Sequence, residues 1–290
     1  MKKGSKEMKK EKGTLYIVGT PIGNLGDITL RAIETLKNVD VILAEDTRQT
    51  LKLLNHFAIQ KHLISYHRHN EDDKISKVKE FLDSGKDLAL VSDAGMPVIS
   101  DPGQNLIQFL LENNYDVVTV PGVTAFVTAI VKSGFDSTRF TFEGFLSMNK
   151  KQRKMRLQSL KNETRTMIFY EAPHKILATL KDMRDYFGNR NICIARELTK
   201  LHEEYLHLTI EEAIEKIEAV GIKGEIVLII EGANEEKLLE SKKEEVSLLS
   251  SVELVKQYMR EGISKKEAMK KVAKLKSITK NEVYQECIDL

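Results

Sequence analysis

Residues 16–36 read YIVGTPIGNLGDITLRAIETL, and this stretch decides the fold class. It begins as an apolar run typical of a β-strand, bends through Gly19, Gly23 and Gly26, and continues with the period of an amphipathic helix. The same order of strand, bend and helix returns along the chain to about residue 133, which predicts a parallel open sheet. Because such sheets bind ligands beyond the carboxyl ends of their strands, we look for chemistry in the loops there.

The pattern predicts two α/β lobes and a helical tail. The first lobe has strands at 14–19, 40–45, 62–67, 87–93 and 116–122 and helices at 27–38, 47–57, 71–84, 103–114 and 123–133, with Asp27 capping the first helix. Gly134 breaks the last of these helices. The second lobe has strands at 140–145, 166–171, 191–197, 204–210 and 224–232 and helices at 149–161, 174–187 and 211–219, which predicts a mixed sheet. The tail has helices near 251–261, 264–274 and 279–288.

The predicted domains are a disordered basic leader (1–12), two lobes (13–134 and 135–233), a charged linker (234–250) and the tail (251–290). The chain of 290 residues is 41% hydrophobic and 30% charged, as in a soluble globular protein. Its net charge of +2 argues against a globally basic nucleic-acid binder. The leader has no apolar core of a signal peptide, and Cys193 and Cys287 form no metal or disulfide motif, so we expect a cytoplasmic protein without a metal.

The first bend fits neither standard phosphate-binding template. Its glycines are spaced G-x-x-x-G-x-x-G, no lysine follows, and Pro21 removes a backbone donor. The second bend, VSDAGMPVISDPG at 91–103, places Asp93 just after a buried strand, where a carboxylate suits hydroxyls or an amine better than phosphate. The third, at 120–130, places the small residues Thr124 and Ala125 in a first helical turn. The three bends together predict a site for a ligand without phosphate.

Six motifs in this order resemble the tetrapyrrole (corrin/porphyrin) methylase superfamily, over about residues 13–233. They are GTLYIVGTPIGNLGDITLRAIETL, ILAEDTRQTLKLL, VSDAGMPVISDPG, FYEAPHK, ARELTK and GEIVLIIEG. The resemblance is closest to the branch that modifies ribosomal RNA. It implies two α/β lobes with S-adenosylmethionine between them, a homodimer, and methylation of the ribose 2'-hydroxyl of a decoding-centre cytidine in 16S rRNA, within the small ribosomal subunit.

The resemblance also implies which residues contact the cofactor. These are Ile22, Asp93, Met96, Thr124, Ala125, Tyr170, Leu198 and Gly232. We expect Gly19 and Gly23 to let the backbone approach the ligand, and Ile22 to supply a contact.

Methyl transfer to a hydroxyl needs a proton acceptor or a cation that stabilises the alkoxide. For the proton we favour Asp46, Glu171 and His174, and for the target phosphate or alkoxide Arg48 and Arg196. Glu45 and Glu197 are further candidates, and each of these residues could instead be a strand-end ion pair or a helix cap.

Two basic segments indicate contact with RNA phosphates. Residues 147–165 hold seven Lys and Arg against one Glu, and residues 262–281 hold seven Lys against one Glu. We expect the contacts at Lys150, Lys151, Arg153, Lys154, Arg156, Lys265, Lys266, Lys270 and Lys271. The alternatives are solvated helix faces and, for Ala268, Val272, Ala273 and Leu275, packing on the second lobe. Aromatic residues that could stack on a base are sparse, with Tyr66, Tyr170 and Tyr205 as candidates.

Two other functions stay open at this point. A small-molecule methyltransferase of corrin biosynthesis would share the cofactor site but would not need the basic segments. A nucleic-acid-binding regulator with a degenerate methylase body would use the helical tail and would not bind the cofactor.

Overall fold

The structure is a computed structural model that describes residues 12–67, 71–240, 249–276, 278–288 and 290. The predicted leader up to residue 11 and residues 241–248 of the predicted linker lie outside the described residues. The chain divides into a larger unit within Met1–Leu160 and Arg165–Glu231 and a smaller unit within Lys161–Thr164 and Gly232–Leu290.

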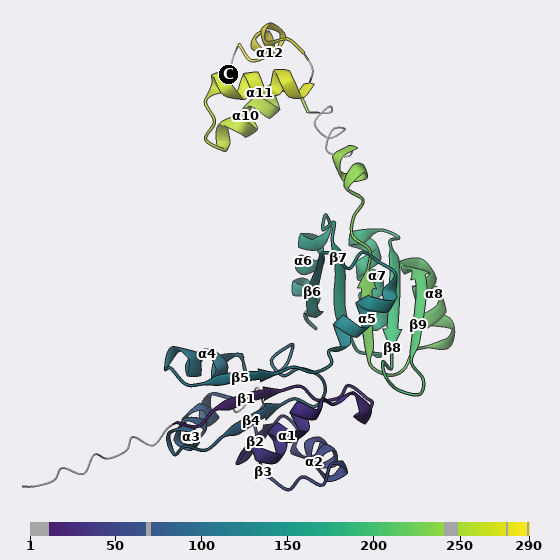
Figure 1. Cartoon of the computed structure of the whole chain (residues 1–290). Coiled ribbons are helices and arrows are strands. Elements are labelled where there is room, and N and C mark those ends of the chain that lie inside the picture. Colours follow the sequence, from purple (N-terminus) through teal and green to yellow (C-terminus); the bar gives the residue numbers. More distant parts are fainter. Residues whose placement is uncertain (1–11, 68–70, 241–248, 277, 289) are drawn as a thin grey trace, which may run out of the picture. The chain divides into compact units, whose positions relative to one another are not determined.

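The first sheet of the larger unit is parallel, as predicted, with the strand order β3-β2-β4-β1-β5 (Figure 1). Its strands are β1 (Leu15–Val18), β2 (Val41–Ala44), β3 (His62–Ser65), β4 (Leu88–Val91) and β5 (Val117–Val120). All four residues of β2 and of β4 are buried, because helices cover both faces of the sheet. One face packs on α3 (Glu71–Asp83) and α4 (Gln104–Glu112), and the other on α1 (Leu30–Asn38) and α2 (Thr47–His56).

The prediction that Asp27 caps the first helix is wrong. Asp27 ends a short 3-10 turn, η1 (Leu25–Asp27), whose cap is the Asn24 side chain. Ile28 is then extended, so α1 begins only at Leu30, and the Thr29 hydroxyl accepts the Ala32 N–H at 3.0 Å as its cap. The sequence Asn-Leu-Gly-Asp contains two residues of a type that caps helices, and the first of them, Asn24, caps the turn.

The second sheet is mixed, as predicted, with the order β6-β7-β10-β8-β9. Its strands are β6 (Phe140–Phe145), β7 (Thr166–Glu171), β8 (Asn191–Arg196), β9 (Glu204–Thr209) and β10 (Ile226–Ile230). Only β6 and β7 pair in parallel, and β10 runs antiparallel to both of its neighbours, β7 and β8. The helices α6 (Lys150–Leu160), α7 (Ile176–Phe187) and α8 (Ile210–Val220) pack in one apolar cluster on one face of the sheet.

The other face of the second sheet is covered by α5 (Ala125–Ser133), which follows β5 in the chain. Ala129 and Ile130 pack on β7, β8 and β10, and the Tyr205 hydroxyl of β9 donates to the Thr128 carbonyl at 3.2 Å. Gly134 ends this helix in the left-handed region at φ 75°, as predicted. The predicted lobe boundary at 134 therefore follows a helix that packs on the second sheet, and the bounds of the two lobes stay a prediction.

The smaller unit contains α10 (Ser251–Arg260), α11 (Lys265–Lys276) and α12 (Lys280–Glu286). Capping boxes start α10 at Ser250 and α12 at Thr279. Its buried core includes Ala268, Val272 and Ala273, so these residues pack inside the module, and Leu275 is 45% exposed. In the part of the chain that the structure describes, every helix is too short or too polar to cross a membrane.

Candidate functional site

Backbone contacts join the three glycine-rich bends. They follow β1, β4 and β5, and β1 pairs with both of the other strands. Thr20 and Gly95 exchange two backbone hydrogen bonds of 2.9 and 3.0 Å. Gly19 lies so close to the third bend that a Cβ there would be 2.7 Å from the Gly122 Cα. The bends therefore form one surface rather than three independent loops.

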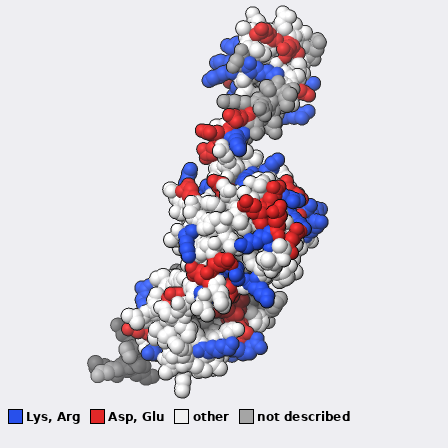
Figure 2. Space-filling view, turned by 90° about the vertical axis from the view of Figure 1, so that its right-hand side faces the viewer, with Lys and Arg blue, Asp and Glu red and all other residues white. Residues whose placement is uncertain are grey.

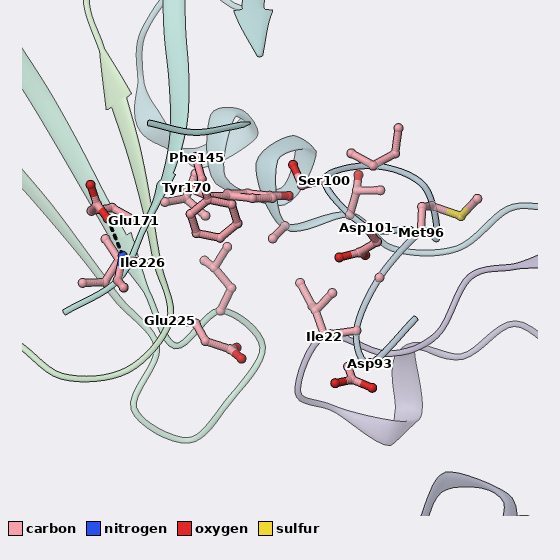
Figure 3. A pocket seen from close by; sticks show the side chains of 18 of the residues that line it. Ile22, Asp93, Met96, Ser100, Asp101, Phe145, Tyr170, Glu171, Glu225 and Ile226 are labelled. Atoms are coloured by element: carbon pink, nitrogen blue, oxygen red, sulfur yellow. Dashed lines mark hydrogen bonds between the residues drawn. The ribbon is translucent and has the colours of Figure 1, made fainter. Parts of the chain in front are cut away.

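A cavity of about 430 Å³ opens beside this surface (Figure 3). Its size is in the range of small-molecule sites. Its wall includes most of the residues that the resemblance implies as cofactor contacts: Ile22, Asp93, Met96, Thr124, Ala125, Tyr170 and Leu198. The cavity lies entirely within the larger unit.

The remaining cofactor candidates, Gly19, Gly23 and Gly232, do not line the cavity. Gly19 is required by its contact with the third bend, as described above. Gly23 has φ +154°, and a Cβ there would be 2.6 Å from the Lys200 Cγ. The structure thus explains glycine at positions 19 and 23 by close packing against other parts of the protein, and not by the predicted approach to the ligand. Gly232 falls in the smaller unit.

The cavity wall is acidic. The structure describes all of the lining residues, and none of them is Lys or Arg. Five of them carry carboxylates: Glu45, Asp93, Asp101, Glu171 and Glu225. Desolvation against the wall raises the pKa of Asp93, and the nearby Asp46 carboxylate adds to this. A cavity of this charge attracts a cationic ligand and repels phosphates.

An aromatic cluster forms another part of the wall. The Tyr170 ring meets Phe142 edge-on at 5.0 Å between centroids and Phe145 at 5.4 Å, and Phe145 is 59% exposed. Figure 3 shows Phe145 and Tyr170 together at one side of the cavity. Burial raises the pKa of Tyr170 to about 12, so its hydroxyl stays neutral. Aromatic faces beside carboxylates favour a flat or cationic ligand.

Asp46 and Arg48 form a closed pair next to the second bend. The Asp46 N–H donates to Asp93 Oδ1 at 3.0 Å, and its carboxylate accepts Arg48 Nε at 3.0 Å and Nη2 at 2.7 Å. The hydrogen bond from the Arg48 side chain lowers the pKa of Asp46 to about 2, which argues against the prediction that Asp46 accepts a proton. Neither residue lines the cavity, but the Arg48 side chain is 87% exposed.

Glu171 ends β7 and lines the cavity, although its side chain is buried. One carboxylate oxygen accepts the Ala172 N–H at 2.8 Å, and the other accepts the Thr179 hydroxyl at 2.6 Å. His174 lies just before α7, is exposed and does not line the cavity. The two proton-transfer candidates of this motif are thus separated by the fold.

Arg196 is not brought to the cavity. Its Nε lies 2.6 Å from Glu204 Oε2, in a strand-to-strand ion pair between β8 and β9. Sequence reasoning did not assign Glu225, Phe145 or Asp101 to the site, although all three line the cavity. Because β10 runs antiparallel to β7, its first residues lie at the same edge of the sheet as the end of β7, and this pairing was the missing signal.

The basic residues of α6 differ in their contacts. Lys150, Lys151 and Lys154 line an open groove with Met155 and Tyr186. By contrast, Arg153 donates to Asp182 at 2.7 Å in a largely buried ion pair, and Arg156 Nε donates to Glu143 at 3.0 Å. The two arginines therefore have close partners inside the protein. The three lysines line the groove, and Lys154 Nζ also lies 3.7 Å from Asp182 Oδ1.

In the smaller unit, Lys266 and Lys270 are exposed on α11. Lys265 donates to the Leu290 carbonyl at 2.7 Å, and Lys271 lies 5.4 Å from the centre of the Tyr258 ring. Figure 2 shows Lys and Arg side chains on the surface of this unit.

Of the stacking candidates, Tyr66 is fully buried, Tyr205 is bonded to α5, and only Tyr170 lines the cavity.

The family model described as tetrapyrrole (corrin/porphyrin) methylases matches residues 14–214. Among curated proteins, the chain is 48% identical to the "Ribosomal RNA small subunit methyltransferase I" of Halalkalibacterium halodurans over 97% of this chain and 96% of that protein. It is 45% identical to the protein of the same name from Bacillus subtilis, over 95% and 94%. The Thermotoga maritima protein of that name is 48% identical over 76% of this chain and 99% of its own length.

Solved structures share the fold at lower identity. A cobalt precorrin-4 methyltransferase has a TM-score of 0.59 at 15% identity and covers 75% of this chain and 94% of its own. A uroporphyrin-III C-methyltransferase from Thermus thermophilus, solved with S-adenosylhomocysteine, has a TM-score of 0.57 at 18% identity, covering 76% and 97%. These likenesses confirm the predicted two-lobe fold.

Proposed function

The chain belongs to the family of tetrapyrrole (corrin/porphyrin) methylases, and we propose that it transfers the methyl group of S-adenosylmethionine to RNA of the small ribosomal subunit. The relatives that carry the ribosomal RNA name support this substrate, because they are 45–48% identical over nearly the whole chain. Solved corrin-pathway enzymes share the fold at only 15–18% identity. We further propose, from the resemblance in the motifs, that the acceptor is the ribose 2'-hydroxyl of a decoding-centre cytidine in 16S rRNA.

The observation that supports the cofactor best is the acidic cavity. S-adenosylmethionine supplies a methyl group on a positively charged sulfur, and it also carries a positive amino group and a negative carboxylate, so it is a cation overall. Five carboxylates without a lining Lys or Arg suit this positive net charge, and the volume of about 430 Å³ suits its size. The aromatic pair Phe145 and Tyr170 offers faces for a purine or for the sulfonium.

Within the reaction, the protein mainly holds the acceptor hydroxyl in line with the methyl group. Glu171 is our choice for the proton acceptor, because among the three residues favoured for the proton, Asp46, Glu171 and His174, it alone lines the cavity. Its bonds from Ala172 and Thr179 fix the carboxylate and leave each oxygen a further lone pair. Arg48, exposed and linked through Asp46 to Asp93, is our choice for a contact with the target phosphate.

RNA contact falls on the lysines that line the groove on α6 or are exposed on α11. We assign it to the groove of Lys150, Lys151 and Lys154 and to Lys266 and Lys270 on α11. Arg153 and Arg156 instead hold α6 to its neighbours. We also propose a cytoplasmic location, since the ribosome is the substrate, and a homodimer, which light scattering after gel filtration would check.

The test is methyl transfer from tritiated S-adenosylmethionine to 30S subunits, to naked 16S rRNA and to a precorrin. We expect label in RNA, at a nucleotide whose 3' linkage resists alkali because its 2'-hydroxyl is methylated. Label in the precorrin alone would favour the corrin-pathway alternative. Failure of calorimetry to detect cofactor binding would favour the nucleic-acid-binding regulator.

A further inference from the structure

Lys200 joins two segments that contribute to the cavity wall. Its Nζ lies 3.0 Å from Glu197 Oε1 and 3.0 Å from Glu225 Oε2. Glu197 Oε1 also accepts the Glu225 N–H at 3.0 Å, and the Glu197 N–H donates to the Glu225 carbonyl at 3.0 Å. Leu198, which follows Glu197 in the chain, and Gly224, which precedes Glu225, line the cavity.

The backbone here is strained in a way that requires support. Glu197 and Thr199 have φ +51° and +65°, which are uncommon for residues with a side chain and especially for the β-branched Thr199. The Thr199 hydroxyl oxygen is buried and has no hydrogen-bond partner among the described residues. Such strain persists at sites where neighbouring groups fix the chain.

Glycines on both sides allow this close packing. A Cβ at Gly23, in the first bend, would lie 2.6 Å from the Lys200 Cγ. A Cβ at Gly224, which has φ +93°, would lie 2.6 Å from the carboxyl carbon of Glu197. Residues 197–200 are therefore held between the first bend and the start of β10, both of which border the cavity.

Glu225 is the residue that this arrangement presents to the cavity. Its side chain is 75% exposed, and in Figure 3 its carboxylate reaches toward Ile22 and Asp93 of the opposite wall. Lys200 bonds to Oε2, whereas Oε1 accepts no hydrogen bond from the described residues. Burial lowers the pKa of Lys200, but its hydrogen bonds to Glu225 and Glu197 outweigh this and raise it, so the ammonium stays charged.

We propose that Lys200 is a positioning residue, which fixes the Glu225 carboxylate so that its second oxygen accepts hydrogen bonds from the ribose hydroxyls of the cofactor. This inference rests on the proposed function. Lys200 shares its single positive charge between Glu197 and Glu225, so it partly compensates the Glu225 carboxylate, whose second oxygen then offers a lone pair that suits a neutral hydroxyl. Asp93, which also lines the cavity, remains for the positive groups of the ligand.

The experiment measures calorimetric affinities of the full chain for S-adenosylhomocysteine and for its 2',3'-dideoxyribosyl analogue. The wild type should prefer the hydroxyl-bearing ligand about 10-fold, the value of one or two hydrogen bonds to a charged group. Glu225→Ala should lose this preference, whereas Glu225→Gln, which keeps an oxygen acceptor, should retain part of it. Lys200→Met should weaken binding in the same direction, and Lys200→Arg should restore part of the loss.

The double variant Lys200→Met with Glu225→Ala should bind no more weakly than Glu225→Ala alone, because Lys200 acts through Glu225. The matched control is Lys181→Met, which removes an ion pair to Glu218 on the same lobe, at 2.6 Å, and should leave both affinities unchanged. Thermal unfolding of each variant checks that it is folded.

Two results would overturn the inference: an unchanged preference for the hydroxyls in Glu225→Ala, or losses that multiply in the double variant. A wild-type chain that binds neither S-adenosylmethionine nor S-adenosylhomocysteine would instead contradict the proposed function itself.

Discussion

The cavity and the groove on α6 carry opposite charges on a chain whose net charge is only +2. Five carboxylates and no lining Lys or Arg surround the cavity, whereas Lys150, Lys151 and Lys154 line the groove without a lining Asp or Glu, in both cases among described residues. Net charge therefore says little about either ligand. The local charge matches a cationic cofactor at one place and a polyanion at the other, so the two partners need not compete.

The largest effect should come from breaking the backbone that shapes the cavity. In Gly19→Ala the new Cβ would lie 2.7 Å from both the Gly122 Cα and the Met96 Sδ. The Met96 side chain can move away, but the Gly122 backbone cannot. We expect a loss of about 3 kcal/mol in the free energy of unfolding, measured with urea, and no detectable cofactor binding.

The control for this substitution lies in the same bend. Gly26→Ala meets only the Asn24 Oδ1, at 3.2 Å, and should fold and bind nearly as the wild type does. Equal stability of the two variants would show that the contact between the bends is not required.

The next effect tests the charge of the cavity. Asp93→Asn removes one carboxylate while keeping an oxygen for the Asp46 N–H, and should weaken S-adenosylmethionine about 10-fold in calorimetry. S-adenosylhomocysteine, whose sulfur is neutral, should lose less. A loss equal for both ligands would mean that Asp93 does not sense the sulfonium charge.

Acid should imitate this substitution. Desolvation raises the pKa of Asp93 above its ordinary 3.8, so protonation begins at a higher pH than for an exposed Asp. As the pH falls through the raised pKa, the carboxylate loses its charge and the affinity for the cation should fall. Affinity measured against pH should lack this step in Asp93→Asn, and a step of the same size in that variant would assign it to another group.

The groove gives a smaller and salt-dependent effect. Charge reversal in the double variant Lys150→Glu and Lys151→Glu should weaken binding to a 16S rRNA fragment and lower the slope of log affinity against log salt by about 0.7–0.9 per lost contact. Cofactor affinity should not change. The control is the double variant Lys37→Glu and Lys216→Glu, which makes the same change of charge at exposed lysines elsewhere. An equal loss of RNA affinity in the control would show that the effect is not specific to the groove.

The smallest effect on the cavity should come from removing residues 234–290. The cavity lies in the larger unit, and the Thermotoga maritima relative matches this chain over 99% of its own length but only 76% of ours. We expect cofactor affinity within about twofold of the full chain and weaker RNA binding, because the lysines of α11 are lost. Loss of cofactor binding would show that the small unit supports the cavity.

Sequence reasoning found the first wall of the site because alternation of strands and helices fixes which loops lie beyond the strand ends. Asp93 and Thr124 were found in this way. It missed Glu225, because only the antiparallel pairing of β10 with β7 brings that residue to the cavity. It also favoured Asp46 as a base, since the sequence does not show that the Arg48 side chain closes back on it.

The excess of carboxylates in the cavity also bears on turnover. Methyl transfer removes one positive charge from the ligand, because the sulfonium becomes a neutral thioether. The same wall that attracts the methyl donor therefore holds the spent donor less strongly, with the protein conformation unchanged. We expect the charge of the wall to favour release of the product and entry of the next donor in each catalytic cycle.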